Sequence, residues 1–285
     1  MQASELFNQP NTILLDGGMG TMLQAAGMKL GTRPEDLNIE NPELIRSIHA
    51  KYAAAGSRVV NANTFGASPH KLADSKYTLE EVITAGIANC KQAVAPYGAL
   101  VTLDVGPLGE LLEPSGTLAF EDAVAEYGRI VRAGVAAGAD ILYFETFTDL
   151  YEMKAALLAA KENSTLPIMA SMSFEANGRT FTGCTVESFA ATARGLGANA
   201  VGINCSLGPK EIFPMAKRLA EAVPGDFPVF VKPNAGLPRA DGSGYDITPQ
   251  LYAMQMKPYR ELHLFAAGGC CGTTPEFIQM LNGVF

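Results

Sequence analysis

The chain of 285 residues lacks tryptophan, contains only three histidines and has no block of basic residues. Its formal net charge of -8 argues against nucleic acid and against an anionic membrane surface as main partners. No apolar stretch reaches the roughly 18 residues that a membrane span requires. The first residues contain neither a charged n-region nor an apolar h-region, so we expect no signal peptide. These absences favour a cytoplasmic protein without nucleic acid or membrane partners.

The sequence also lacks the spaced Cys-x-x-Cys pairs that are typical of closed structural zinc sites. It contains five cysteines, an odd number, which in a chain without an export signal favours thiols kept for metal binding or chemistry. The histidines His49, His70 and His263 show no metal-ligand spacing, and we expect His49 on the surface of a helix. Cys90 falls in a helical pattern and is expected in the core.

Short apolar runs recur along the chain, and helical patterns separate them. The runs cover residues 12–16, 58–63, 100–105, 141–145, 167–173, 200–205, 228–232 and 264–268. The helical patterns cover residues 41–55, 78–94, 119–137, 149–162, 186–196, 209–223, 248–256 and 275–281. Nearly continuous apolar runs are typical of parallel strands covered on both faces. The pattern predicts an α/β fold, a (β/α)8 TIM barrel forming a single domain over residues 1–285, with a doubly wound open sheet as the alternative.

The carboxyl ends of the eight runs carry most of the reactive side chains. A TIM barrel has its active site at this end of the strands. The polar and reactive residues there are Asp16, Asn61, Asn63, Asp104, Glu145, Ser173, Asn204, Cys205, Lys232, Asn234, Cys270 and Cys271. Three of the five cysteines therefore fall at one end of the predicted barrel.

These three cysteines, Cys205, Cys270 and Cys271, predict a metal site. Three thiolates suit Zn²⁺, and three protein ligands with a vacant position are the pattern of a catalytic zinc rather than a structural one. Such a site suits an incoming substrate thiol, which would lose its proton on binding and remain a nucleophile. Buried apolar cysteines are the alternative interpretation. A redox disulfide between the adjacent Cys270 and Cys271 is disfavoured by ring strain.

Two carboxylates and a glycine-rich turn suggest an amino-acid ligand. Asp16 and Glu145 end apolar strands, where a carboxylate needs a partner, and they can hold a substrate ammonium or serve as hydrogen-bonded structural groups. The segment 17–20, Gly-Gly-Met-Gly, begins a helix whose free N–H groups can bind a carboxylate or phosphate. It is not a dinucleotide fingerprint, because Leu23 stands where that motif requires a third glycine. Together these features suit an amino acid that bears a thiol.

The chain resembles the homocysteine S-methyltransferase family over essentially its whole length. The matching segments are residues 15–21 (LDGGMGT), 63–65 (NTF), 145–146 (ET), 202–205 (GINC) and 269–275 (GCCGTTP). The resemblance implies a (β/α)8 barrel with zinc held by Cys205, Cys270 and Cys271. It also implies that L-homocysteine binds the zinc through sulfur. The residues implied to contact this substrate are Asp16 and Glu145 at the amino group, backbone groups of Gly17, Gly18 and Met19 at the carboxylate, and Asn204.

Within the family the chain is most similar to the homocysteine-binding module of cobalamin-dependent methionine synthases, on segments 179–183 (RTFTG) and 233–238 (PNAGLP) and on Gly272. This similarity implies methylcobalamin as donor, carried by a separate corrinoid protein or domain, with room for the corrinoid at Gly272. It also implies Asn234 as an extra zinc ligand when substrate is absent. S-methylmethionine or betaine is the alternative donor, and a non-catalytic zinc-binding subunit is the alternative of another class. A full-length enzyme, a subunit and an excised module all stay open.

Overall fold

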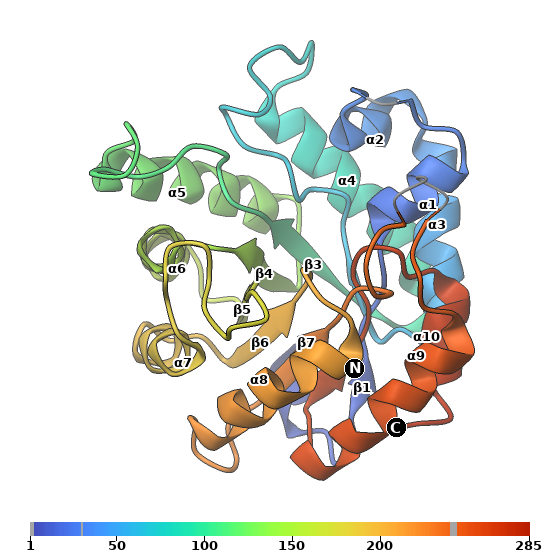
Figure 1. Cartoon of the computed structure of the whole chain (residues 1–285). Coiled ribbons are helices and arrows are strands. Elements are labelled where there is room, and N and C mark those ends of the chain that lie inside the picture. Colours follow the sequence, from blue (N-terminus) through green and yellow to red (C-terminus); the bar gives the residue numbers. More distant parts are fainter. Residues whose placement is uncertain (1–2, 30, 240–243) are drawn as a thin grey trace.

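Eight parallel strands form a barrel at the centre of the computed structural model, which describes residues 3–29, 31–239 and 244–285 (Figure 1). The strands are β1 (Ile13–Leu14), β2 (Val59–Asn61), β3 (Leu100–Val105), β4 (Ile141–Phe147), β5 (Ile168–Met172), β6 (Ala200–Asn204), β7 (Val229–Lys232) and β8 (Ala266–Ala267). Their order in the sheet is β1-β8-β7-β6-β5-β4-β3-β2. A parallel bridge between Leu15 and Val59 joins the two ends of this sheet and closes the barrel. The predicted TIM barrel is confirmed.

Helices alternate with the strands and surround the barrel, as the ring of labels from α3 to α10 in Figure 1 shows. The α-helices are α1 (Met19–Ala25), α2 (Leu37–Glu40), α3 (Pro42–Ala54), α4 (Leu79–Val94), α5 (Phe120–Ala136), α6 (Leu150–Asn163), α7 (Val186–Gly195), α8 (Pro209–Glu221), α9 (Pro249–Met256) and α10 (Pro275–Leu281). Short 3₁₀ helices are η1 (Ala3–Asn8), η2 (Pro34–Asp36), η3 (Ala95–Tyr97) and η4 (Lys257–Leu262). Side-chain caps at Asn41, Thr78 and Asp149 fix the starts of α3, α4 and α6.

Along the inward face of the strands, apolar side chains in the barrel interior are followed by polar side chains at its mouth. Tyr143 and Phe230 belong to the small apolar cluster inside the barrel. Two residues further along the same strands, and therefore on the same face, come Glu145 and Lys232. The carboxyl ends of the strands thus place ionisable groups directly on top of the apolar interior.

Helix α3 departs from the prediction at His49. The expected surface position is wrong, because the side chain is 0% exposed. Ile45, Ile48, His49 and Tyr52 are all buried and share one helical face, since they are spaced by three and four residues. Neither ring nitrogen of His49 has a hydrogen-bond partner among the described residues. The expectation for Cys90 is confirmed, since it lies fully buried in the core.

Within the described part of the chain, no helix has the length and apolar character needed to cross a membrane.

Candidate active site

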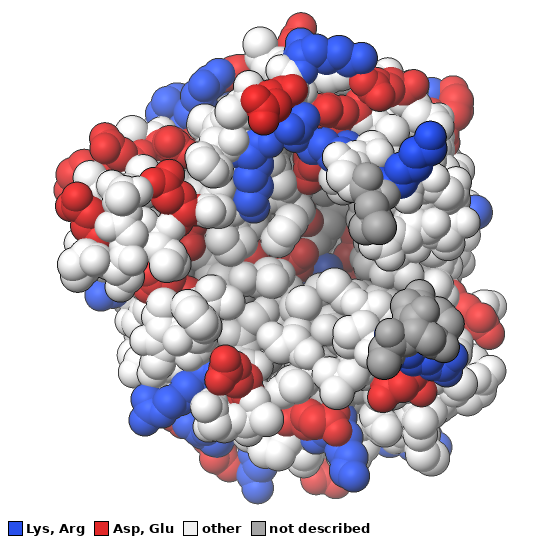
Figure 2. Space-filling model, turned by 45° about the horizontal axis from the view of Figure 1, so that its top comes forward, with Lys and Arg blue, Asp and Glu red and all other residues white. Residues whose placement is uncertain are grey.

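A cavity of about 350 Å³ opens at the carboxyl ends of the strands. In Figure 2 it is the hollow near the centre of the face shown, with acidic and basic side chains at its floor. Its lining includes Asp16, Gly17, Gly18, Met19, Glu35, Asn61, Phe65, Asp104, Glu145, Thr146, Cys205, Lys232, Tyr245, Cys270 and Cys271. This is the end of the barrel at which TIM-barrel enzymes bind their substrates.

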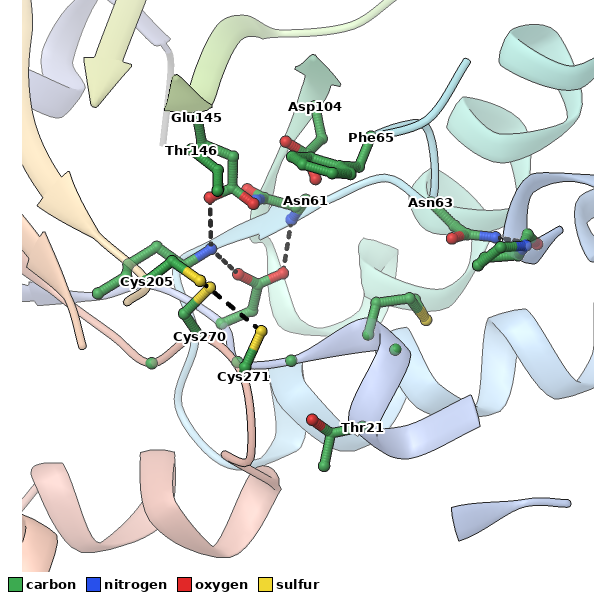
Figure 3. Close-up of a pocket in the computed structure, with 18 of the residues that line it drawn as sticks. Thr21, Asn61, Asn63, Phe65, Asp104, Glu145, Thr146, Cys205, Cys270 and Cys271 are labelled. Carbon is green, nitrogen blue, oxygen red and sulfur yellow. Dashed lines mark hydrogen bonds and ion pairs between the residues drawn. The ribbon is translucent and has the colours of Figure 1, made fainter. Parts of the chain in front are cut away.

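The three predicted cysteines meet on one side of this cavity (Figure 3). The Sγ atoms of Cys205, Cys270 and Cys271 all lie within 4.8 Å of one another, and those of Cys205 and Cys271 are 3.8 Å apart. All three are free thiols. Backbone hydrogen bonds fix them, because Cys205 N donates to the carbonyl of Lys232 at 3.1 Å and Cys270 N to that of Pro233 at 2.8 Å. The loops after β6 and β8 are therefore tied to β7 between them.

The thiols of this cluster share protons unequally. Hydrogen bonds from Cys205 and Cys270 lower the pKa of the Cys271 thiol to about 3, whereas hydrogen bonds with Cys205 and Cys271, followed by burial, raise the pKa of Cys270 well above its usual value. These shifts favour a thiolate at Cys271 and thiols at Cys205 and Cys270. The cluster is the donor set that a soft divalent metal ion prefers.

Asp16 and Glu145 lie together at the floor of the cavity, and Lys232, to which the sequence analysis assigns no role, lies between them. Lys232 Nζ is 3.0 Å from Asp16 Oδ1 and 3.4 Å from Glu145 Oε2. The three side chains are nearly inaccessible, with residue exposures of 2% for Lys232, 3% for Asp16 and 7% for Glu145. Asp16 Oδ2 also accepts a hydrogen bond from Asn61 N at 2.8 Å. The two carboxylates thus share an internal counter-ion.

Burial and ion pairing act in opposite directions on these groups. Burial raises the pKa of Asp16 and of Glu145, and the charge of Lys232 lowers both. Burial alone would lower the pKa of Lys232, but Asp16 and Glu145 outweigh it and raise that pKa above its ordinary value. Lys232 therefore carries its positive charge at neutral pH. The Tyr143 ring, whose centroid is 5.4 Å from Nζ, supports the charge from the barrel interior.

Asn204 is fully buried behind the cavity wall, and its side-chain amide is used within the protein. Oδ1 accepts from Thr146 N at 2.9 Å and from Ser171 Oγ at 2.8 Å. Nδ2 donates to Thr146 Oγ1 at 2.7 Å and to Glu145 Oε2 at 3.4 Å. Thr146 has a φ of 67°, a strained value for a β-branched residue. Asn204 therefore holds the end of β4 in an unusual conformation beside the site.

The turn of Gly17 and Gly18 lines the cavity together with Met19, the first residue of α1. Close packing requires glycine there, since a Cβ on Gly17 would lie 2.7 Å from Thr273 Oγ1 and one on Gly18 would lie 2.8 Å from the Cys270 carbonyl oxygen. The Gly18 N–H donates to Thr273 Oγ1 at 3.2 Å. The turn that was expected to bind a carboxylate is thus packed directly against the cysteine loop.

Asn234 and Gly272 flank the cysteines. Asn234 lies outside the cavity lining, and its Oδ1 accepts a hydrogen bond from Cys271 N at 3.0 Å. Gly272 has a φ of +80°, and a Cβ there would lie 2.3 Å from Cγ of Tyr245. The space next to Gly272 is therefore filled by the tyrosine ring, which itself lines the cavity.

The family model described as homocysteine S-methyltransferase matches residues 13–285. This chain belongs to the homocysteine S-methyltransferase family. The predicted resemblance is confirmed. It is 30% identical over 285 residues to the methionine synthase of Mycobacterium tuberculosis, a match that covers 93% of this chain and 24% of that protein. The methionine synthase of Mycobacterium leprae is likewise 30% identical, with 93% of this chain and 23% of that protein covered.

The chain thus spans about a quarter of the length of these curated relatives. Among solved structures, the oxidised form of the homocysteine methyltransferase MmuM from Escherichia coli matches over 98% of both chains, with 25% identity and a TM-score of 0.84. The chain therefore matches the Escherichia coli homocysteine methyltransferase over nearly the whole of both chains. It matches only one segment of the two mycobacterial methionine synthases.

Proposed function

We propose that this chain transfers a methyl group to the thiol of L-homocysteine and forms L-methionine, with Zn²⁺ held by Cys205, Cys270 and Cys271. The observation that carries the proposal is the convergence of three thiols from the loops after β6 and β8, within 4.8 Å of one another, on the wall of a cavity floored by carboxylates. Membership of the homocysteine S-methyltransferase family supports the substrate.

The residues present fit a zinc ion. The cluster consists of three thiols and contains no fourth His, Cys, Asp or Glu ligand among the described residues. Three protein ligands beside a cavity are the arrangement of a catalytic rather than a closed structural zinc site, which disfavours a purely structural subunit. When bound, zinc would lower the pKa of a substrate thiol and keep it as a nucleophilic thiolate at neutral pH. We keep Asn234 as a candidate extra ligand in the absence of substrate, and binding would require its hydrogen bond to Cys271 N to break.

The protein residues would position the substrate for an in-line displacement. We propose that Asp16 and Glu145 create the negative potential that attracts the substrate ammonium, and that the Gly17–Gly18–Met19 turn receives its carboxylate. Asn204 would act through Thr146 and Glu145, which it holds by hydrogen bonds. The substrate sulfur forms a bond to the methyl carbon as the bond from that carbon to the donor breaks. Orientation and exclusion of water account for the protein's share of the rate.

For the donor we propose methylcobalamin, carried by a separate corrinoid protein or domain in the cytoplasm, with residues 1–285 as one homocysteine-binding domain. Support comes from the methionine synthases, of which this chain matches only one segment. S-methylmethionine, a small donor that the family resemblance leaves open, is the second candidate. Betaine is a third.

Methionine formation tests the proposal directly. The zinc-loaded protein is incubated with L-homocysteine and one of three donors, methylcobalamin, S-methylmethionine or betaine, and Cys205→Ala serves as the control. Turnover with methylcobalamin alone supports the full proposal, and turnover with another donor alone replaces the donor but keeps the reaction. Absence of methionine in all three tubes with zinc bound, or unchanged turnover and zinc content in Cys205→Ala, would refute the proposed reaction or its metal site.

A further inference from the structure

The carboxylates expected to bind the substrate's ammonium group already bind an ammonium group of the protein. Lys232 contacts Asp16 and Glu145 at 3.0 and 3.4 Å, and all three side chains lie at the floor of the cavity. Lys232 occupies Asp16 Oδ1 and Glu145 Oε2, and Asn61 N occupies Asp16 Oδ2. A substrate ammonium has three hydrogens and would share these acceptors with Lys232, so a further carboxylate would complete its hydrogen bonds.

Asp104 is the cavity carboxylate that lacks such a partner. It lines the cavity and is 6% exposed, and its Oδ1 has no hydrogen-bond partner among the described residues. Glu35, the other carboxylate in the lining, is engaged, because its Oε1 accepts a hydrogen bond from Gly66 N at 2.6 Å. A buried carboxyl oxygen without a partner is costly, and such a cost is retained where a ligand compensates for it.

The register of the barrel places Asp104 beside the other acidic groups. Asp104 pairs with Tyr143 across strands β3 and β4, and Glu145 is the next residue of β4 on the same face. Figure 3 shows Asp104 next to Glu145 and Phe65, across the cavity from Cys271. The cysteines and Asp104 therefore line different sides of the same cavity.

Acidic side chains outnumber basic ones in this cavity. Its lining contains Asp16, Glu35, Asp104 and Glu145, and Lys232 is the single basic side chain there among the described residues. Burial, followed by the charge of Glu145, raises the pKa of Asp104 well above its usual value. A ligand that brings a positive charge to this group of acids would stabilise their charged forms.

From these observations we infer that Asp104 is a specificity-determining residue, which accepts a hydrogen bond from the ammonium group of the amino-acid substrate while Lys232 holds Asp16 and Glu145 in place. The inference rests on the proposed function, because it takes an amino acid bearing a thiol as the ligand. It assigns the selection of the amino group to a residue on β3.

Two ligands that differ only in the ammonium group test this role. L-homocysteine and 4-mercaptobutanoate share the thiol, the carboxylate and the chain between them, and only homocysteine has the amino group. Binding of each is measured by calorimetry to zinc-loaded wild type, Asp104→Asn and the matched control Glu35→Gln. Asp104→Ser is the second variant, and a cooperative thermal transition with full zinc content qualifies each protein for comparison.

We expect Asp104→Asn to weaken homocysteine binding by about 10- to 100-fold and to leave 4-mercaptobutanoate binding within about twofold of wild type. Glu35→Gln should change both affinities by the same factor. Equal effects of both Asp104 variants on the two ligands, or no effect on either, would overturn the assignment while leaving the proposed function intact. Failure of the wild type to bind homocysteine would instead refute the proposed function, and this inference with it. Loss of zinc or of folding in both Asp104 variants would make Asp104 a structural residue and overturn its assignment.

Discussion

Lys232 Nζ lies 3.0 Å from Asp16 Oδ1, although the two residues are 216 positions apart in the chain. The contact joins the ends of β7 and β1 across the barrel mouth. Glu145 of β4 contacts the same ammonium at 3.4 Å, so one lysine connects three strands at the floor of the cavity. The charge balance of the candidate active site therefore depends on a residue that is neither a thiol nor an acid.

Replacing this lysine should be strongly destabilising. Lys232→Met leaves two buried carboxylates without their counter-ion, and removing one partner of a buried ion pair costs about 3–5 kcal/mol of unfolding free energy. The matched control is Lys91→Met, which breaks the partly exposed 3.3 Å contact between Lys91 and Asp140 and should cost less than about 1 kcal/mol. Urea unfolding at pH 7.5 measures both. Similar costs for the two variants would contradict the internal counter-ion role of Lys232.

We expect the Tyr245 ring to be the reason why position 272 must be glycine. Alanine at a φ of +80° is strained by about 1–2 kcal/mol, and its Cβ would also displace the Tyr245 ring. We expect Gly272→Ala to lower the unfolding free energy by about 2–4 kcal/mol in the wild-type background. In a Tyr245→Ala background the cost should fall to the backbone strain alone. A double-mutant cycle gives the coupling directly, and a coupling near zero would show that the ring is not what excludes a side chain at Gly272.

The barrel could be predicted from the sequence because each of its signals is local. Apolar runs, glycines and cap residues such as Thr78 mark strand and helix limits without reference to the rest of the chain. The convergence of Cys205 with Cys270 and Cys271 could also be predicted, because a parallel barrel brings all strand ends to one rim. The three thiols themselves indicate a metal site, and the family resemblance adds homocysteine as the expected substrate.

The charge partners could not be predicted in the same way. Lys232 is the last residue of a strand, where a lysine usually reaches solvent, and only the closed barrel places it between Asp16 and Glu145. Asn204 stays a proposed substrate contact, and the sequence did not indicate that its amide is also engaged by Thr146 and Ser171. For His49, the spacing of four residues from Ile45 already indicates the buried face of α3, contrary to the expected surface position.

His49 should make the fold sensitive to acid. Burial lowers its pKa from 6.5 to about 3, so the unfolded chain takes up a proton at a pH where the folded protein does not. The part of the unfolding free energy that depends on neutral His49 is fully present above pH 6.5. It is lost as the pH falls from 6.5 towards 3. The difference in unfolding free energy between His49→Leu and wild type should therefore grow by up to about 1.4 kcal/mol for each pH unit below that point. A difference that stays constant between pH 7.5 and pH 5 would rule out this effect.

The zinc coordination number, measured by X-ray absorption at the zinc edge with and without L-homocysteine, tests the central claim most directly. We predict three sulfur neighbours at about 2.3 Å in the protein alone and a fourth when homocysteine is added. Cys205→Ala should lose one protein sulfur or the metal itself. A sulfur count that homocysteine does not change, or a site with four protein sulfurs, would contradict a zinc centre that binds and activates the substrate thiol.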